Sequence, residues 1–310
     1  MNKFKKILLV LTLVFVVVAG YFLKNYGPNF GIYIFPPSVE EYVNKALRNM
    51  DNGINANTEE WKKERQRVLE KSKEFKKLKD SHDTLEEAIK VAGGKHSFII
   101  RPVVANKSAK NIKYPLTQML EEEILYIKLP PIMLGTGEEN QKYVNTVASE
   151  IDKENYKGIV VDLRHNTGGD MYPMIASIAS LLPDRTILEF KNSVGQKTPI
   201  KIKEGQFKYL SVSDKKINNV PVAVLIDKMT GSSGEITALA LKNIEGVKFF
   251  GEDSAGYTSV NSTFNLYDNL MLFLTTASIV DNNGKEYLNE KIKPDVYTNN
   301  AIREAYYWLK

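Results

Sequence analysis

The hydrophobic residues of this chain fall into two kinds of pattern. Near the N-terminus an uncharged run extends from Ile7 to Leu23, and as a helix it would span roughly 25 Å. Further along, short apolar runs alternate with segments of helical periodicity and predict buried strands at 158–162, 220–226 and 247–251. Because strands alternate with helices before a final series of hairpins, we expect a mixed α/β core.

Residues 27–91 contain the helical patterns that precede this core. After a short extended link, capping residues and periodicity predict three helices. They run from Ser38 to about Asn49, from Asn57 or Thr58 to about Leu78, and from a capping box of Asp83 and Glu86 to about Val91. Two interpretations are open: the region is a wall that guides a peptide to a site, or a small bundle that separates the core from the N-terminal segment.

Residues 92–310 make up the rest of the chain. Beyond the three buried strands, alternating apolar residues predict further strands, and the turn at Tyr267-Asp268-Asn269 predicts a hairpin. These strands are expected at 124–129, 187–190, 198–202, 263–266 and 270–276. We expect the strands at 187–190 and 198–202 to cap the site. The predicted organisation is an anchor (1–26), a helical region (27–91) and a core (92–310).

The N-terminal segment carries Lys3, Lys5 and Lys6 ahead of its apolar run. Positive residues stay on the cytoplasmic side of a membrane, so the rest of the chain is expected to face outward. The sequence Val18-Ala19-Gly20 is a mediocre cleavage site, and the apolar run is longer than most signal-peptide cores. This favours a retained, single-pass anchor over a cleaved signal peptide.

Composition narrows the classes of function. The chain has no cysteine, which excludes disulfides, a thiolate nucleophile and a zinc-thiolate site. Its net charge of +5 comes from dispersed lysines, a pattern typical of a solvated basic surface rather than of a nucleic-acid interface. We expect no metal, no cofactor and no nucleic-acid partner.

The stretch 220–241 holds the first candidate for chemistry. A buried strand leads through a turn at 227–231 into an amphipathic helix, and Ser232 lies at the junction. Ser232 and Glu235 fit the Ser-x-x-Glu capping box, so one interpretation makes Ser232 a helix cap. The other makes it a nucleophile, because the amide of Ser233 and the helix dipole would face an oxygen that develops charge. Ser233 is the rival nucleophile.

The stretch 157–173 has the same form. A strand at 158–162 leads into a turn with Gly168 and Gly169, and a helix begins near Asp170 or Met171. The glycines let the main chain approach a phosphate or an oxyanion closely. Neither nucleotide-binding fingerprint fits the turn, and residues 230–234 do not match the G-x-S-x-G of α/β-hydrolases.

Four motifs follow one another along the core. They are DLRHNTGGD at 162–170, TGSSGEI at 230–236, GEDSAGYTSVN at 251–261 and KPDV at 293–296. Their order and spacing resemble those of the serine peptidases of the C-terminal processing and tricorn type. With VAGGKHSF at 91–98 and the membrane segment, the resemblance covers essentially the whole chain. It is closer still to the branch that confers resistance to the lantibiotic nisin on Gram-positive bacteria, and it implies a mixed-sheet serine peptidase core.

A serine nucleophile needs a base, and the chain has three histidines. His82 lies in a charged helical linker, and His165 lies in the glycine turn, from which it could reach the site. The resemblance places the catalytic histidine in the Gly-Gly-x-His-Ser-Phe context, which is His96. It therefore implies a dyad of Ser232 and His96.

Two residues depart from the wider family pattern. Tyr257 stands where the processing proteases carry a lysine base, so a Ser-Lys dyad is not available at that position. Lys95 precedes His96, where tricorn-like members have a serine. Glu290 is a candidate for a carboxylate that orients the histidine.

The expected oxyanion hole combines the amide of Ser233 with that of Gly168, and Gly169 is the next choice. The segment between Ile100 and Leu125 is too short for the PDZ domain that processing proteases insert there, so the peptidase itself must grip its substrate. The resemblance implies a membrane-anchored serine peptidase that cuts the C-terminal tail of nisin, or of a related lantibiotic, outside the cell. The alternative is a non-catalytic protein of the same fold that sequesters the peptide.

Overall fold

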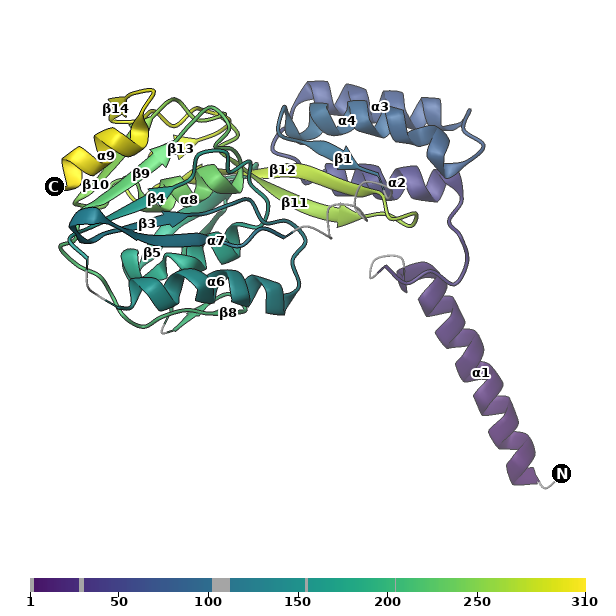
Figure 1. Ribbon diagram of the computed structural model, residues 1–310. Coiled ribbons are helices and arrows are strands. Elements are labelled where there is room, and N and C mark those ends of the chain that lie inside the picture. Colours follow the sequence, from purple (N-terminus) through teal and green to yellow (C-terminus); the bar gives the residue numbers. More distant parts are fainter. Residues whose placement is uncertain (1–2, 28–30, 102–111, 154–155, 204) are drawn as a thin grey trace. The chain divides into compact units, whose positions relative to one another are not determined.

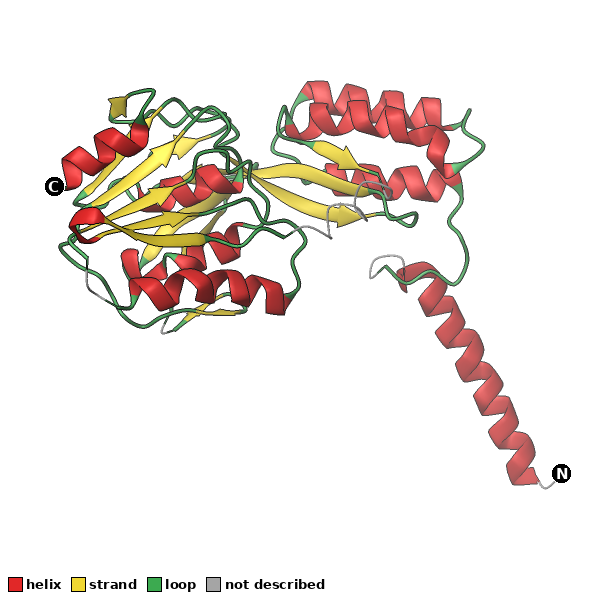
Figure 2. Ribbon diagram, in the orientation of Figure 1, coloured by secondary structure: helices red, strands yellow, loops and turns green. Residues whose placement is uncertain are grey.

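The computed structural model describes residues 3–27, 31–101, 112–153, 156–203 and 205–310 (Figure 1). The chain forms two compact units, and Figure 2 distinguishes their helices from their strands. The first unit comprises Met1–Pro102 and Ser262–Leu274, and the second comprises Val103–Asn261 and Thr275–Lys310. The expected mixed α/β class is confirmed.

The first unit is mainly helical. Its helices are α1 (Lys3–Tyr26), α2 (Val39–Met50), α3 (Glu59–Ser72), the 3-10 helix η2 (Leu78–Ser81) and α4 (His82–Gly93). The strand β1 (Phe98–Ile100) pairs antiparallel with the first part of β12 (Met271–Val280), which also pairs with β11 (Ser259–Asn265). Among the described residues, α1 is the one helix long and apolar enough to cross a membrane, a property that signal sequences share.

The core of the first unit joins its helices to the tip of the β11–β12 hairpin. Apolar side chains at helical spacing face inward from α2, α3 and α4. The largest of them is Trp61, whose indole N–H donates to Asp51 Oδ1 at 3.0 Å. Residues of the segment 262–274 complete this core, although sequence patterns grouped them with the region 92–310. They are Leu266, Leu270, Leu272 and Leu274.

A six-stranded sheet forms the centre of the second unit. Its order is β14-β10-β9-β4-β3-β2, and every neighbouring pair is parallel except β2 with β3. The strands are β2 (Leu116–Leu120), β3 (Ile124–Lys128), β4 (Gly158–Asp162), β9 (Val222–Ile226), β10 (Val247–Gly251) and β14 (Val296–Tyr297). Because β4 and β9 are adjacent and parallel, the turns that follow them meet at the same edge of the sheet.

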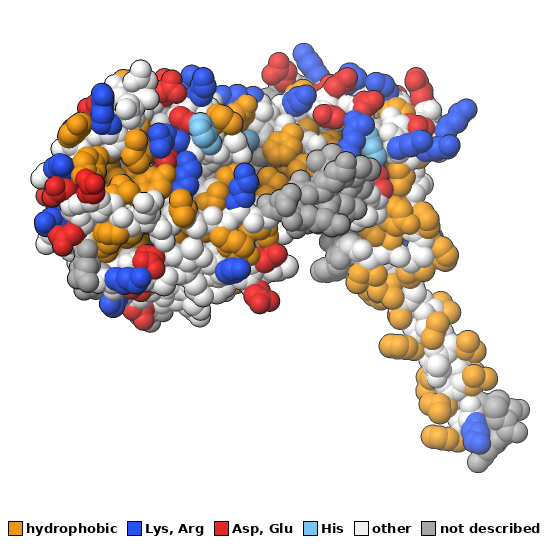
Figure 3. Space-filling model, in the orientation of Figure 1, with side chains coloured by type: hydrophobic (Ala, Val, Ile, Leu, Met, Phe, Trp, Pro, Cys, Tyr) orange, Lys and Arg blue, Asp and Glu red, His pale blue; other side chains and the backbone are white. Residues whose placement is uncertain are grey.

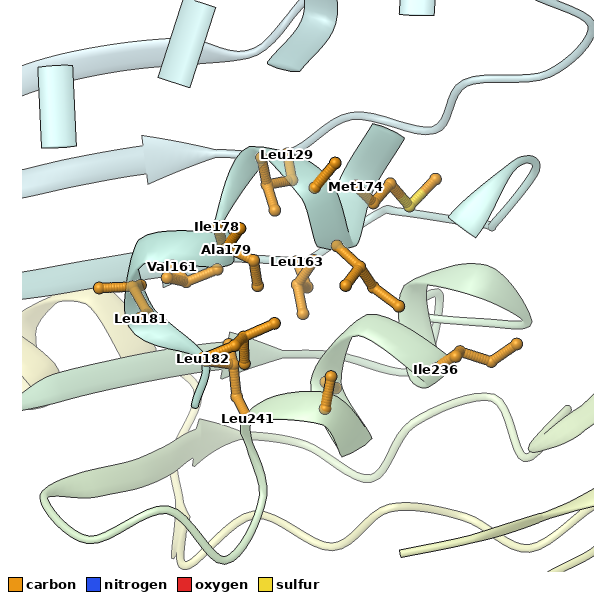
Figure 4. Packing of buried hydrophobic residues seen from close by; sticks show 14 of the residues in the cluster. Leu129, Val161, Leu163, Met174, Ile178, Ala179, Leu181, Leu182, Ile236 and Leu241 are labelled. Carbon is orange, nitrogen blue, oxygen red and sulfur yellow. The ribbon is translucent and has the colours of Figure 1, made fainter. Parts of the chain in front are cut away.

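Alternate residues of these central strands enter two different cores. Val160, Ala223 and Leu225 pack against one helix, while Ile159, Val161 and Val224 pack with three helices on the other face. The single helix is α9 (Ala301–Leu309), and the three are α6 (Gly137–Ile151), α7 (Met171–Ser177) and α8 (Ser233–Leu241). Figure 4 shows part of the larger core, in which Val161 and Leu163 are drawn with Met174 of α7, side chains of the segment 178–182, and Ile236 and Leu241 of α8.

An antiparallel sheet and a short hairpin complete the second unit. The strand β5 pairs with β6 and with the second part of β12, which also pairs with β13. The remaining elements are β5 (Thr186–Asn192), β6 (Lys197–Lys201), β7 (Gln206–Phe207), β8 (Leu210–Ser211), β13 (Glu286–Tyr287), η3 (Glu121–Glu123) and η4 (Ala179–Leu181). The strands β7 and β8 pair with each other as a hairpin.

Some predicted helix ends are wrong. The helix α3 ends at Ser72 rather than near Leu78. The helix α4 begins at His82, so the capping box predicted at Asp83 and Glu86 is not formed. Both carboxylates instead accept hydrogen bonds from Arg101, at 2.6 and 3.0 Å. The two carboxylates that the sequence pattern predicted to cap the helix thus bind Arg101, a residue outside the helix.

Candidate active site

Ser232 lies where β9 leads through its turn into α8. Its backbone has φ 53° and ψ −122°, a conformation that is costly for any residue with a side chain. A serine that only caps a helix has an extended backbone, as Ser38 has at α2 with φ −63° and ψ 161°. Strain at a strand-to-helix turn is the geometry that presents a nucleophilic serine in other hydrolases.

The carboxylate of Glu235 holds this strained turn. The side chain is fully buried, and it accepts hydrogen bonds from four donors. They are the amides of Ser232 (2.9 Å), Gly256 (2.8 Å) and Tyr257 (2.7 Å) and the hydroxyl of Ser254. Burial raises the pKa of Glu235, and the four donors act in the opposite direction. One carboxylate therefore couples the serine turn to the loop 254–257.

The glycine turn follows β4. Gly168 and Gly169 have φ values of 108° and 120°, which favour glycine. A Cβ atom on Gly168 would lie 2.7 Å from Cβ of Ser232, and one on Gly169 would lie 1.9 Å from the carbonyl oxygen of Ile132. Both positions thus require glycine, and the main chain of Gly168 lies directly against Ser232.

Asn166 fastens the glycine turn from inside. It is fully buried, and its Oδ1 accepts the amide of Gly168 at 3.0 Å while its Nδ2 donates to the carbonyl of Leu129 at 2.9 Å. Its own carbonyl accepts the amide of Gly231 at 2.9 Å. Sequence reasoning missed Asn166, although an asparagine between a buried strand and a Gly-Gly pair is the kind of signal that marks such a hinge.

Three further hydrogen bonds join the two turns. They run from the amide of His165 to Asp227 Oδ1 (3.0 Å), from the hydroxyl of Thr230 to the carbonyl of Leu163 (2.9 Å) and from the hydroxyl of Ser233 to the carbonyl of Gly169 (2.6 Å). Because of the last bond, the hydroxyl of Ser233 is engaged in holding the two turns together. The turns therefore form one body in which Ser232 and Ser233 have different surroundings.

The main-chain amide next to Ser232 is that of Ser233, and the glycine turn adds the amides of Gly168 and Gly169. The amide of Ser233 is in the first turn of α8, where helix geometry provides no partner, and its nitrogen is 3.1 Å from the position that a Cβ on Gly168 would take. Among the described residues, no hydrogen bond engages the amide of Gly169, whereas that of Gly168 donates to Asn166. Such amides are suited to stabilise an oxyanion.

Asp162 anchors the end of β4 that leads into the glycine turn. It is fully buried, and it accepts two side-chain hydrogen bonds from Arg164 (3.0 and 2.8 Å) and one from the hydroxyl of Tyr126 (2.7 Å). Burial opposes ionisation, yet these bonds and the nearby charge of Lys128 lower the pKa of Asp162. The strand end is therefore fixed by an ionised carboxylate.

His96 lies in the first unit, in the turn between α4 and β1. Its side chain is buried, with 6% of the residue surface exposed. Burial, together with the charge of Lys95, lowers the pKa of His96 to about 4. The imidazole is therefore neutral near pH 7, which is the state that a general base requires.

The other two histidines have carboxylate partners. His165 Nδ1 lies 2.6 Å from Asp227 Oδ2, and its side chain is 69% exposed. His82 Nε2 lies 2.8 Å from Asp268 Oδ2. The other carboxylate oxygen of Asp268, Oδ1, accepts a hydrogen bond from the hydroxyl of Tyr42. His82 thus belongs to the polar contacts that hold the hairpin tip on α2 and α4.

The remaining candidates occupy the loops of the second unit. Tyr257 donates its amide to Glu235, and 37% of the residue surface is exposed. Glu290 has an exposed carboxylate 3.7 Å from Lys285 Nζ, and its amide and carbonyl both bind the hydroxyl of Thr258. Its role as an orienting carboxylate stays a prediction.

A strained serine at a helix N-terminus, beside a glycine turn on the edge of a mostly parallel sheet, is characteristic of the class of serine hydrolases that stabilise an oxyanion. Residues 123–298 match the family model of peptidase family S41. The chain belongs to this family of serine peptidases. The matched range contains both turns and the loop 254–257.

The chain is similar to curated proteins of two kinds. It is 39% identical over 312 residues to a nisin-resistance protein of Lactococcus lactis subsp. lactis, and the match covers 99% of this chain and 98% of that protein. It is 28% identical to a carboxy-terminal-processing protease of Bartonella bacilliformis over 67% of this chain and 44% of that protein.

Solved structures show the same two levels of similarity. A lipoprotein from Streptococcus agalactiae is 36% identical, with a TM-score of 0.84 over 90% of this chain and 98% of that one. The photosystem II D1 C-terminal processing protease has a TM-score of 0.56 over 86% of this chain and 94% of that one. At 14% identity, the second likeness shows the fold alone.

Proposed function

We propose that the protein is a membrane-anchored serine peptidase in which Ser232 is the nucleophile and His96 the general base. The observation that carries this proposal is the strained backbone of Ser232, held by the buried carboxylate of Glu235. Membership of family S41 supports the hydrolysis of a peptide bond. Because His96 and Ser232 belong to different units, their pairing is proposed from the sequence resemblance and from the surroundings of each residue.

The proposed reaction has two halves. His96 accepts the hydroxyl proton of Ser232 as its oxygen attacks the peptide carbonyl, and then gives that proton to the leaving amine. Water, deprotonated by the same imidazole, releases the acyl group and restores the serine. A buried imidazole with a pKa of about 4 is neutral at the start of each half.

The proposed oxyanion hole combines the amides of Ser233 and Gly169. The amide of Gly168, the first choice from sequence, donates to Asn166 Oδ1 at 3.0 Å, which favours Gly169 as the second donor. Gly168 then serves by its lack of a side chain, since a Cβ atom there would displace Ser232. Removal of one such donor typically lowers turnover about 10²- to 10³-fold.

The proposed substrate is nisin or a related lantibiotic, cut in its C-terminal tail. The nisin-resistance protein of Lactococcus lactis, 39% identical over nearly the whole chain, supports this assignment. An extended tail can enter an active site where a thioether ring cannot. We propose that α1 stays in the membrane and holds the peptidase outside the cell, where cationic peptides gather on an anionic surface.

The test is to incubate the full-length protein with nisin and to weigh the products. We expect one truncated peptide that lacks a short C-terminal tail. The variants Ser232→Ala and His96→Ala should give no product, whereas His165→Ala, which removes an exposed histidine paired with Asp227, should remain active.

Two results would overturn the proposal. Activity of Ser232→Ala together with inactivity of Ser233→Ala would move the nucleophile by one residue. Nisin that stays intact but co-purifies with the wild-type protein would replace the peptidase by the alternative function, sequestration without cleavage.

A further inference from the structure

The first unit contains a pocket that is separate from the candidate active site. It lies between the segment 33–37 and α2, with Lys24 of α1 and Leu266 of the hairpin tip at its border. Its volume is about 860 Å³, counting space open to solvent. Tyr33 packs edge-on against Tyr267, with ring centroids 4.9 Å apart, and this contact holds the segment 33–37 against the hairpin tip. The pocket is therefore built from four parts of the chain: α1, the segment 33–37, α2 and the hairpin tip.

Cations outnumber carboxylates in this pocket. Lys24, Lys45 and Arg48 line it, and Glu41 is its acidic residue. The carboxylate of Glu41 is already engaged, because it accepts the amide of Ser38 at 2.8 Å. Among the described residues, Lys24 and Arg48 have no carboxylate within ion-pair distance. The pocket thus has positive charge that its own acidic residue does not balance.

The cations on α2 also oppose each other. Burial and the charge of Arg48 lower the pKa of Lys45, so bringing these two side chains to one pocket costs electrostatic free energy. A bound anion would relieve this cost, and a guanidinium beside an ammonium is a common arrangement for holding phosphate. A cationic peptide would instead be repelled.

Apolar side chains adjoin the cations. Ile34 and Phe35 line the pocket and are 45% and 70% exposed, and Ile32 just before them is 51% exposed. These residues follow α1, along which hydrophobic side chains project at the surface in Figure 3. Exposed aromatic and aliphatic residues next to a membrane helix are typical of the interface between headgroups and acyl chains.

We propose that this pocket binds the headgroup of an anionic phospholipid, with its phosphate on Lys24, Lys45 and Arg48 and its glycerol and upper acyl chain against Ile34 and Phe35. This inference rests on the part of the proposed function that keeps α1 in the membrane, and it is independent of the catalytic residues. Such a lipid would hold α2, and with it the helical core of the first unit, at the membrane surface.

The test uses native mass spectrometry of the detergent-solubilised full chain. Dioleoylphosphatidylglycerol is the anionic probe, dioleoylphosphatidylcholine the zwitterionic one, and inorganic phosphate the headgroup-free anion. We expect retained adducts with phosphatidylglycerol at concentrations where phosphatidylcholine gives none. The double variant Lys45→Gln/Arg48→Gln should bind phosphatidylglycerol about 30-fold more weakly, since each surface cation contributes roughly fivefold.

A matched variant separates the pocket from general charge. Lys63→Gln/Lys71→Gln removes the same charge from α3, outside the pocket, and should bind like the wild type. Equal binding of the two lipids, equal loss in both double variants, or displacement of phosphatidylglycerol by equimolar inorganic phosphate would each overturn the proposal. Circular dichroism confirms that each variant is folded. Because no peptide is present, failure here leaves the peptidase proposal intact, and Ser232→Ala should bind lipid normally.

Discussion

The two turns that follow β4 and β9 both contain residues with a positive φ, but they stabilise this backbone conformation in different ways. Both lead from a buried parallel strand into a helix at the same edge of one sheet. The glycine turn reaches its left-handed backbone with residues that have no side chain, Gly168 and Gly169. The serine turn places a residue with a side chain at φ 53° and holds it with the buried carboxylate of Glu235.

This difference reflects what each turn presents: the glycine turn presents main-chain amides, and the serine turn presents a side-chain hydroxyl. A turn that only has to present amides can use glycine, whose conformational freedom costs little in a strained turn. A turn that must present a hydroxyl has to keep a Cβ atom in a costly conformation, and a set of hydrogen bonds must offset that cost. The serine turn is therefore expected to depend on one side chain, and the glycine turn on the absence of side chains.

The largest effect is expected from Gly169→Ala. Its new Cβ atom would lie 1.9 Å from the carbonyl oxygen of Ile132, so the turn must shift. We expect loss of nisin cleavage and a free energy of unfolding lower by more than about 3 kcal/mol, beyond the usual cost of a left-handed residue. Chemical denaturation and product mass measure the two effects.

Gly195→Ala is the control for backbone strain alone. Gly195 also has a positive φ, 83°, but a Cβ atom there would meet no neighbour within 4 Å. It should cost about 1 kcal/mol and leave activity unchanged. Equal effects of the two alanine variants would contradict the role given to the close packing of the glycine turn.

Glu235→Gln should have the next largest effect. Glutamine has an NH₂ group in place of one carboxylate oxygen, and this group cannot accept the hydrogen bonds that the oxygen accepted. Buried donors around it therefore lose their acceptor, which should lower the free energy of unfolding by about 2 kcal/mol. Since Glu235 positions Ser232 without touching substrate, kcat should fall about 10²-fold with little change in KM. Steady-state kinetics with a tail peptide and denaturant unfolding measure both quantities.

The control for Glu235 is Glu139→Gln. Glu139 accepts the amide of Thr136 at 2.8 Å in an exposed capping box at α6, and glutamine serves this motif well. It should change stability by less than about 0.5 kcal/mol and not affect turnover. If Glu235→Gln behaved in the same way, its carboxylate would be an ordinary helix cap.

The pH dependence tests His96. Its pKa is about 4 in the folded chain, below the ordinary value near 6.5. The profile of kcat/KM should therefore stay level from pH 7 to about 5 and fall with a midpoint near 4. A midpoint at 6.5 or above would contradict the buried, neutral base.

The same shift makes a prediction for stability. Between about pH 6.5 and 4 the unfolded chain binds a proton at His96 that the folded chain does not, so stability falls as the pH falls through this window. The difference amounts to about 3 kcal/mol at full protonation of the unfolded state. His96→Asn should lack this part of the slope in denaturant unfolding measured across the window.

The smallest effect is expected from Ser233→Ala. The hydroxyl of Ser233 donates to the carbonyl of Gly169 at 2.6 Å, and its loss should cost about 1 kcal/mol of stability. The amide that we assign to the oxyanion hole remains, so turnover should fall less than tenfold. An inactive Ser233→Ala enzyme would show that this hydroxyl takes part in the chemistry.

Local sequence patterns predicted the parts of the fold that depend on neighbours in the chain. The strand at 158–162 matches β4, whose β-branched residues are buried on both faces, and the strand at 247–251 matches β10, in which Phe249 and Phe250 are buried. The Ser38 cap of α2 was also correct. The strand β2 was missed, since the residues 116–120 are mostly exposed and show little alternation.

The site was predictable in its residues but not in its connections. A capping box signalled Ser232 and Glu235, yet the bonds from Glu235 to the loop 254–257 join residues 19 to 22 positions apart. The choice between Gly168 and Gly169 depends on where Asn166 points, and no sequence pattern encodes that direction.

The most direct test of the account is to label the nucleophile. The full-length protein is treated with a fluorophosphonate, which bonds to activated serine hydroxyls, and the modified residue is located by peptide mass mapping. We predict one adduct, on Ser232, that is lost in His96→Ala and retained in His165→Ala. An adduct on Ser233, or cleavage of nisin by a protein that takes no label at Ser232, would contradict the account.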